Sequence, residues 1–189
     1  KAAPPKGEAP SSTLPGIRAR LGAETSVEVR NCIVMNCSAT QGVIDVQIGR
    51  DAKAVIANNL VVNNAGEAIY CRTNYHDQNN PAQFHVHHNT VLFVWKADPV
   101  ASYGGSCIMF DNAVKVVAEN NVFGFGDYGG VNNVKKAVGL TLTENICVGN
   151  ALFDYRELIP TCLWMRWKIM RSISILVLRA TKRYKCNCP

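Results

Sequence analysis

The residues best suited to acid–base chemistry lie in short segments in which apolar and polar residues alternate. Asp111 and Asp154 carry carboxylates that can serve as acid and base, and Tyr70 carries a phenol that can stack on a sugar ring or abstract a proton. If the two aspartate segments are strands stacked two repeats apart, the carboxylates lie roughly 10 Å from each other, near the upper limit for an inverting glycosidase. The spacing therefore makes Asp111, Asp154 and Tyr70 candidate catalytic residues.

Charged and aromatic residues beside these three are candidates for substrate binding. Aligned as strands, the segments predict two neighbouring outward columns, the first of Asp45, Tyr70, Met109 and Asp154 and the second of Gln47, Arg72, Asp111 and Arg156. Arg72 and Arg156 suit the carboxylate of an acidic sugar, and the loops around His76 and Trp95 would wall a groove. The alternative is that both columns are ordinary cross-strand ion pairs, each of which stabilises little.

An asparagine followed by apolar residues recurs five times and predicts the elements that position these candidates. The five are Asn31, Asn59, Asn89, Asn121 and Asn145, at intervals of 28, 30, 32 and 24 residues. Apolar residues alternate around each of them, which is the two-residue period of a strand with one buried face. A repeat of this length with two or three short strands is typical of one coil of a parallel β-helix. A leucine-rich repeat would need a Leu-x-x-Leu-x-Leu frame, which the chain lacks.

The recurring asparagines are predicted to form a ladder at one corner of the coil. Asparagine adopts the left-handed backbone conformation of a sharp corner more readily than other non-glycine residues. Its side-chain amide can also bond the matching amide in the next coil, about 4.8 Å along the stack. We therefore expect an all-β, right-handed parallel β-helix of about five coils, with Asn59, Asn89 and Asn121 bonded along its axis.

The segment from Val27 to about Glu157 resembles the right-handed parallel β-helix superfamily with the pectate-lyase-like fold. The resemblance rests on "NNLVVNN" and "ENNVFGF", which are specific for the fold and weak for function. That superfamily includes polysaccharide lyases, glycoside hydrolases, epimerases, phage tailspikes and non-catalytic surface proteins. No catalytic motif of any one of these matches, so no residue role is transferred. The resemblance implies an extracellular, periplasmic or cell-surface location and allows Ca²⁺ as a cofactor, although the sequence requires none.

The chain divides into three parts. Residues 1–26 are rich in Pro, Gly and small residues and read as an irregular linker or covering loop, before the parallel β-helix of residues 27–157. Residues 158–189 form an atypical basic tail without the asparagine motif, either the product of a reading-frame slip or a native cap. We expect no regular further coil beyond about Leu158. The chain begins without Met and lacks a signal-peptide core, which favours a mature or excised piece.

The net charge depends on the tail. It is +6 for the whole chain, but residues 158–189 carry seven Lys or Arg and no Asp or Glu, so the remainder has 13 basic and 14 acidic residues, a charge of −1. The body therefore gives no support to nucleic-acid binding. No apolar run approaches the 18 or so residues of a membrane span.

Cysteine and histidine offer no strong metal motif. The eight Cys lack paired CxxC spacings, and Cys71 and Cys107 fall at or next to inward positions, which favours packing in the core over disulfides. His85 and His87 project from one face of a strand, but the aligned positions in neighbouring coils carry no carboxylate. We therefore predict no metal site, and His88 would only cap the turn.

Two function classes follow from these patterns. The first is a carbohydrate-active or carbohydrate-binding β-helix, such as a lyase, hydrolase or epimerase, whose partner is an acidic polysaccharide. The second is a non-catalytic solenoid with a structural, adhesive or binding role. Fold analogy is the main support for the first class.

Overall fold

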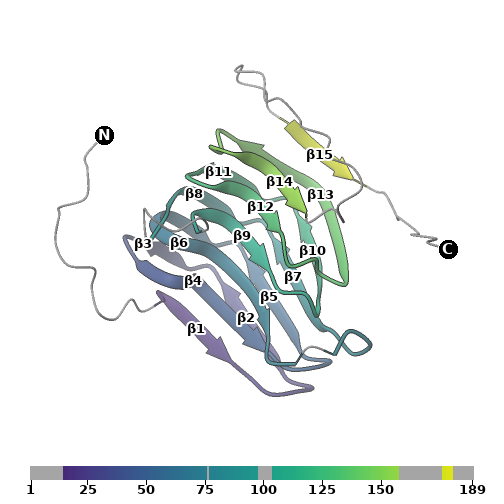
Figure 1. The fold of residues 1–189 in the computed structure, drawn as a ribbon. Coiled ribbons are helices and arrows are strands. Elements are labelled where there is room, and N and C mark those ends of the chain that lie inside the picture. The colour runs from purple at the N-terminus through teal and green to yellow at the C-terminus, as the bar shows by residue number, and fades with distance from the viewer. Residues whose placement is uncertain (1–14, 76, 98–103, 158–175, 181–189) are drawn as a thin grey trace.

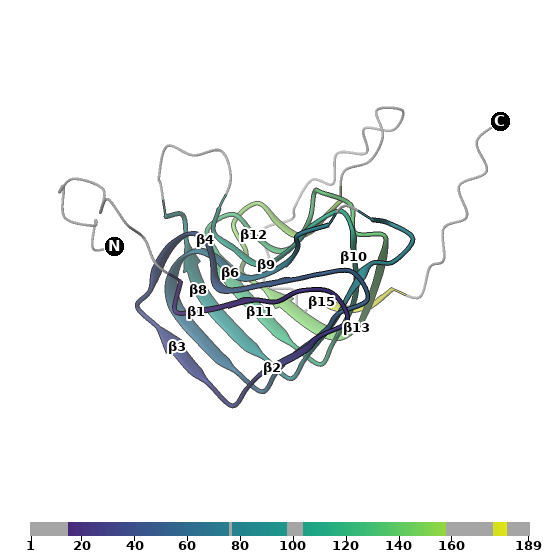
Figure 2. The same cartoon turned by 90° about the horizontal axis from the view of Figure 1, so that it is seen from below.

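The computed structural model describes residues 15–75, 77–97, 104–157 and 176–180. Every regular element within these ranges is a β-strand, and successive strands of one face run parallel to one another along a single stack (Figure 1). The predicted all-β parallel solenoid of about five coils is confirmed. Seen nearly along the stack, each coil has three sides, with β1 and β4 across one of them (Figure 2).

Three faces make up the solenoid. Face 1 contains β2 (Ser26–Arg30), β5 (Lys53–Ala57), β7 (Ala82–His87), β10 (Val114–Glu119) and the first half of β13 (Gly139–Val148). Face 2 contains β3 (Ile33–Met35), the start of β6 (Leu60–Thr73), β8 (Thr90–Trp95), β11 (Val122–Gly126) and the end of β13. Face 3 contains β1 (Ile17–Arg20), the end of β4 (Ser38–Ile48), the end of β6, β9 (Ser106–Phe110), β12 (Gly129–Asn133) and β14 (Phe153–Glu157).

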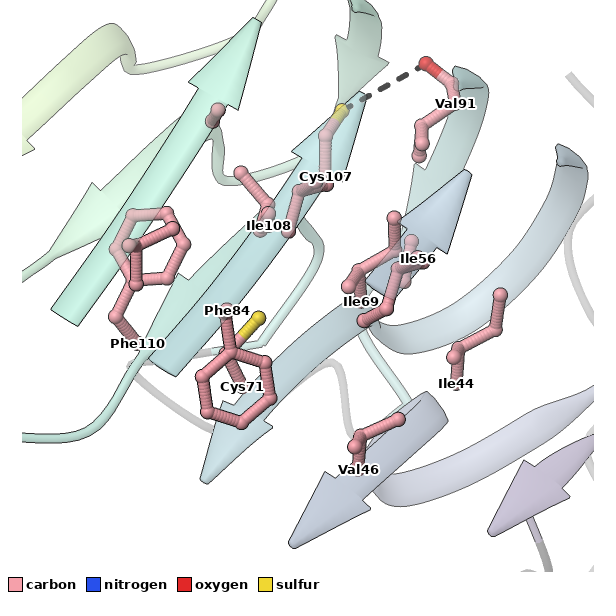
Figure 3. Packing of buried hydrophobic residues seen from close by; sticks show 14 of the residues in the cluster. Ile44, Val46, Ile56, Ile69, Cys71, Phe84, Val91, Cys107, Ile108 and Phe110 are labelled. Carbon is pink, nitrogen blue, oxygen red and sulfur yellow. Dashed lines mark hydrogen bonds between the residues drawn. The ribbon is translucent and has the colours of Figure 1, made fainter. Parts of the chain in front are cut away.

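The core consists of the inward residues of all three faces. On face 1 the parallel register stacks Val29, Ile56, Val86, Ala118 and Leu142 in one buried column, one residue from each coil. On face 3 the same two-residue period stacks Ile44, Ile69 and Ile108 beside Val46, Cys71 and Phe110 (Figure 3). These columns are buried, so the alternation in the sequence correctly identified the core.

The cysteines in the described part of the chain are free thiols. Cys71, Cys107 and Cys147 are buried, and the Cys107 thiol lies 3.9 Å from the carbonyl oxygen of Val91 (Figure 3). Burial raises the pKa of all three thiols, which keeps them protonated and unreactive at neutral pH. They act as small core residues, as expected from the sequence.

The corner between faces 1 and 2 holds a ladder of buried asparagine amides. Asn59 Nδ2 donates to Asn89 Oδ1 at 2.9 Å, Asn89 Nδ2 to Asn121 Oδ1 at 2.9 Å, and Asn121 Nδ2 to Asn145 Oδ1 at 2.8 Å. Each of these amides also donates to a backbone carbonyl, such as that of Ile56 for Asn89. The ladder therefore satisfies buried polar groups from one coil to the next.

The structure corrects two details of this ladder. Asn31 does not belong to it, because Cys32 occupies the ladder position in the first coil and its backbone N–H donates to Asn59 Oδ1 at 3.0 Å. Asn31 instead accepts a hydrogen bond from the exposed Asn58, at 2.7 Å. The left-handed residue is also not the ladder asparagine but the residue before it: Asn31, Asn58, His88, Asn120 and Glu144 all have φ between 54° and 56°.

A second corner, between faces 2 and 3, also places a left-handed residue directly before the position of the ladder asparagine. It has no continuous ladder. Its left-handed residues are Asn36, Asn63, Phe93, Phe125 and Gly149. The next residue in two of the coils is an asparagine that binds the backbone of the coil before it: Asn64 Oδ1 accepts from Cys37 N at 2.8 Å, and Asn150 Oδ1 from Gly126 N at 2.9 Å. Val94 and Gly126 occupy this position in the coils between.

The first end of the stack begins one strand earlier than the sequence predicted. Residues 1–26 were expected to be irregular, but Ile17–Arg20 forms β1, which pairs parallel to β4 with Ile17 opposite Ile44. Ile17 and Ala19 pack against the core, and β1 is the first strand of face 3. At the other end, β15 (Leu176–Ala180) pairs antiparallel to β13, unlike the coils (Figure 1). Residues 158–175 and 181–189 lie outside the described residues.

Candidate functional site

The candidate site lies at the middle of face 3, where residues of three successive coils meet. The two-residue period of β6 turns Tyr70 and Arg72 outward, and β9 continues the register with Met109 opposite Tyr70. Asp111 follows directly after β9, and Lys135 lies in the turn after β12. The predicted neighbours Tyr70, Arg72 and Asp111 therefore do lie together.

Asp111 is the centre of this cluster. Its carboxylate is only 8% exposed, and Oδ1 accepts hydrogen bonds from the Tyr70 hydroxyl at 3.0 Å and from Lys135 Nζ at 2.7 Å. Lys135 also donates to the Tyr70 hydroxyl oxygen, and Thr73 N donates to Asp111 Oδ2 at 3.4 Å. Protein donors therefore occupy both oxygens, so proton transfer to a substrate would first require these bonds to break.

The two titratable partners of Asp111 are poorly suited to act as bases. Burial raises the pKa of Tyr70 to about 12, so the phenol keeps its proton at neutral pH. Burial opposes the charge on Lys135, but hydrogen bonds to Asp111 and Tyr70 outweigh it and raise the pKa of this lysine. The site therefore contains a cation and a protonated phenol around a carboxylate, which suits ion binding better than proton abstraction.

Arg72 connects this cluster to a second buried carboxylate. Its Nη1 donates to Asp45 Oδ1 at 3.3 Å and to the side-chain carbonyl of Gln41, and its guanidinium lies 5.1 Å from the centre of the Tyr70 ring. Asp45 is fully buried, and its Oδ2 also accepts from Arg18 Nε at 3.2 Å. The Nε of Arg72 is buried without a hydrogen-bond partner among the described residues and lies 4.0 Å from Asp111 Oδ2.

Asp154 does not form the predicted pair with Asp111. The register of β14 places Arg156 opposite Asn132, in the column of Tyr70, and leaves Asp154 beside Gly130, two residues earlier. Relative to the column of Asp111, Asp154 is displaced by four residues, or ~13 Å along the strand. Its Oδ1 accepts from Asn150 Nδ2 at 2.9 Å. This separation is too large for an acid–base pair in glycoside hydrolysis.

The predicted groove residues do not gather at the site either. His76 lies outside the described residues. Trp95 pairs with Ala65, five residues or ~16 Å before Tyr70 along β6. The Trp95 indole donates to Asn63 Oδ1 at 2.8 Å, at the corner between faces 2 and 3. Arg156 is in the predicted face but at the last coil, where it donates to the Tyr128 hydroxyl.

Lys135 and Arg18 are the site residues that the sequence did not suggest. Lys135 lies in "GGVNNVKK", the coil whose strand could not be aligned because glycines and asparagines replace the apolar alternation. Arg18 lies in the segment read as irregular. An alternating "IRAR" was the available signal for β1, but four residues are too few to distinguish a strand from a loop.

Face 1 carries a separate group of histidines. His85 Nε2 lies 2.8 Å from Glu119 Oε1, and His87 Nδ1 lies 2.9 Å from His88 Nδ1. Glu119 is opposite His87 in the next coil, so it reaches His85 diagonally, which alignment along single columns did not reveal. Burial and neighbouring charge, chiefly that of His85, lower the pKa of His87.

The described residues do not fit a bound metal ion. No group of three or more His, Cys, Asp or Glu side chains in these ranges is placed to hold one. The two carboxylates of face 3 are already paired with Arg and Lys, so they do not offer the oxygen-rich cage that Ca²⁺ requires. A shallow depression does exist, but it lies on face 1, between Lys53, Gln83, His85 and Lys115.

Comparisons with protein-family models, with curated proteins and with solved structures found no match to this chain. Within the described ranges, no helix has the length and apolar character needed to cross a membrane. The sequence and the structure together identify a parallel β-solenoid with a charged cluster on face 3.

Proposed function

We propose that this chain is a non-catalytic binding solenoid that holds an anionic polysaccharide along face 3. The observation that carries the proposal is the unequal exposure of opposite charges. The carboxylates of Asp45 and Asp111 are 0% and 8% exposed, whereas the side chains of Arg18 and Lys135 are 35% and 47% exposed. The carboxylates therefore lie beneath the cations, and the surface that a ligand meets is positive.

The spacing of the cations supports a polymer as the ligand. Arg18 lies on β1, Arg72 on β6, Lys135 after β12 and Arg156 on β14, so the cations follow one another along the stack. Strands in neighbouring coils are ~4.8 Å apart, so cations two coils apart are separated by ~10 Å. An extended uronate polymer with regularly repeating carboxylates can contact such a row, with bidentate bonds to arginine.

The geometry favours binding over catalysis. A lyase, hydrolase or epimerase needs a base or an acid–base pair, but Tyr70 keeps its proton, Asp111 is held by protein donors and Asp154 is displaced. The same proposal places the chain among the pectate-lyase-like proteins, which the asparagine ladder and the three-sided coils support. It also includes a secreted or cell-surface location, because such polymers lie outside the cell.

The test is titration of the whole chain with polygalacturonate and with a neutral polymer of similar length. We expect binding to polygalacturonate alone, weakened by salt. Arg20 is also exposed on face 3, on β1 opposite Gln47, and binding should be at least tenfold weaker in Lys135→Gln combined with Arg20→Gln. The matched control is Lys53→Gln with Lys115→Gln, which removes two exposed lysines from face 1. Equal loss in both double variants would contradict a site on face 3, and release of shortened chains would contradict a non-catalytic role.

A further inference from the structure

Face 2 presents an uncharged outer surface through all five coils. The parallel register places two residues of each coil outward, in the columns Ile33, Leu60, Thr90, Val122, Ile146 and Met35, Val62, Leu92, Gly124, Val148. None of these ten residues carries a charge, and Thr90 is the only one with a polar side chain. A sheet face that met only water would alternate inward apolar residues with outward polar ones.

Several large apolar side chains of this face and its corner are exposed. Ile33 is 70% exposed and Met35 51%. At the corner beside them, Phe93 and Phe125 stack with ring centroids 5.0 Å apart and planes 10° from parallel, and both remain more than two-fifths exposed. Trp95, two residues after Phe93 on β8, adds a third exposed ring. Contiguous apolar patches of this kind on a folded protein mark interaction sites.

The other two faces differ from face 2 because they carry charged residues at outward positions. Face 1 carries Lys53, Lys115 and Glu119 at outward positions, and face 3 carries the arginines and lysine described above. β15 pairs antiparallel with β13 at the end of the stack and so extends the sheet there (Figure 1). Face 2 is therefore a flat apolar surface bordered by charged ones.

We infer that face 2 is the contact surface between two copies of this chain, packed sheet against sheet. An uncharged face offers nothing to a charged or strongly polar partner, whereas an identical face matches it in both chemistry and flatness. A two-fold axis through face 2 would bring each apolar column onto the corresponding face of the other copy, at the ~10 Å spacing of stacked sheets.

The available area suits a stable dimer. At ~200 Å² for a fully exposed large apolar residue, the exposed fractions of Ile33, Met35, Leu60, Phe93, Trp95, Phe125 and Ile146 correspond to roughly 650 Å². The half-buried Val62, Leu92, Val122 and Val148 add to this surface. A standard interface buries ~800 Å² on each partner. The two copies would also leave both charged faces open to solvent, so this contact is independent of the ligand proposed for face 3.

The experiment is sedimentation equilibrium of the whole chain over a range from about 0.1 to 100 µM. We expect a monomer–dimer equilibrium for the natural sequence, with the dimer dominant at the upper end. Ile33→Lys and Leu92→Lys should each weaken dimerisation at least 50-fold, because a lysine would be buried opposite an apolar face. Val138→Lys is the matched control, since Val138 is 42% exposed but lies before β13 at the far end of face 1. Unchanged thermal unfolding would show that the variants fold.

Three results would overturn the inference. The first is a monomer at all concentrations. This outcome includes a monomer that binds lipid vesicles through face 2 and a monomer that covers this face with its own terminal residues. The second is a dimer that Ile33→Lys and Leu92→Lys leave unchanged. The third is a dimer that Val138→Lys weakens equally, which would indicate a general effect of added charge.

Discussion

Faces 2 and 3 are built from the same coils, and β6 runs continuously through both, yet their outer surfaces differ completely. Outward residues of face 2 are apolar and exposed, such as Ile33 and Leu60. Outward residues of face 3 form a network in which Asp45 and Asp111 are buried beneath basic side chains. The backbone register therefore fixes where a side chain lies, whereas the residue at each outward position decides what the face can bind.

The largest expected change in stability tests whether the charges of face 3 form a buried network or a simple charged surface. Asp45→Asn should destabilise the chain by about 3 kcal/mol, because Arg72 and Arg18 would lose their shared carboxylate partner in a buried setting. Asp127→Asn, at an exposed aspartate, should change stability by less than about 0.5 kcal/mol. Denaturant unfolding of the two variants measures the difference. Equal stability would mean that face 3 is no more than a set of surface ion pairs.

The corner between the two faces should make stability depend on pH. Glu67 is buried there, its Oε2 accepts from Ser106 N at 2.9 Å, and burial raises its pKa to about 7. Because the folded state holds this proton more tightly than the unfolded state, whose pKa is near 4.5, stability should fall as pH rises from about 4.5 to 7. The loss should be on the order of 3 kcal/mol at pH 8, at ~1.4 kcal/mol per pKa unit.

The variant Glu67→Gln isolates this effect from that of other titrating groups. The difference in unfolding free energy between natural chain and variant should change between pH 4.5 and 7 and stay constant above pH 7.5. A difference that is flat across the whole range would show that Glu67 is not held protonated by burial.

A somewhat smaller change in stability is expected at the asparagine ladder, which lies at the corner between faces 1 and 2. Asn89→Leu should cost about 2 kcal/mol, because it removes the oxygen that accepts from Asn59 N and Nδ2 and the amide that donates to the carbonyl of Ile56. Asn31→Gly is the matched control, since Asn31 carries the same motif but is exposed and outside the ladder, and glycine accommodates its left-handed backbone. Chemical denaturation should show little change for this control. Equal losses would contradict the assignment of Cys32 to the ladder position.

The fold was predictable because its determinants are local and repeated. An asparagine at nearly even spacing and alternating apolar residues identified the coils and most core columns, including Ile44, Ile69 and Ile108. The exception at Asn31 arose because a corner uses two consecutive residues, a left-handed one and a ladder one. In "RNCI" the only asparagine occupies the first of these positions, where Asn58 and Asn120 lie in later coils.

The site was predictable only in part, because it depends on register and on turns. The pairing of Tyr70 with Asp111 followed from the alternation, but a shift of two residues in β14 removed Asp154 from the cluster. Lys135 reaches Asp111 from a turn, and turns carry no period from which the direction of a side chain can be inferred. Burial also raises the pKa of Tyr70, and burial of an outward residue depends on segments distant in sequence, such as the turn that holds Lys135.

Lysine footprinting tests the central claim, that face 3 is the binding face, most directly. The whole chain would be acetylated with and without polygalacturonate, and modification at each lysine would be quantified by mass spectrometry. We expect the polymer to protect Lys135, which is 47% exposed on face 3, and to leave Lys53 and Lys115 on face 1 as reactive as before. Protection of Lys53 and Lys115 with no change at Lys135 would contradict binding at face 3.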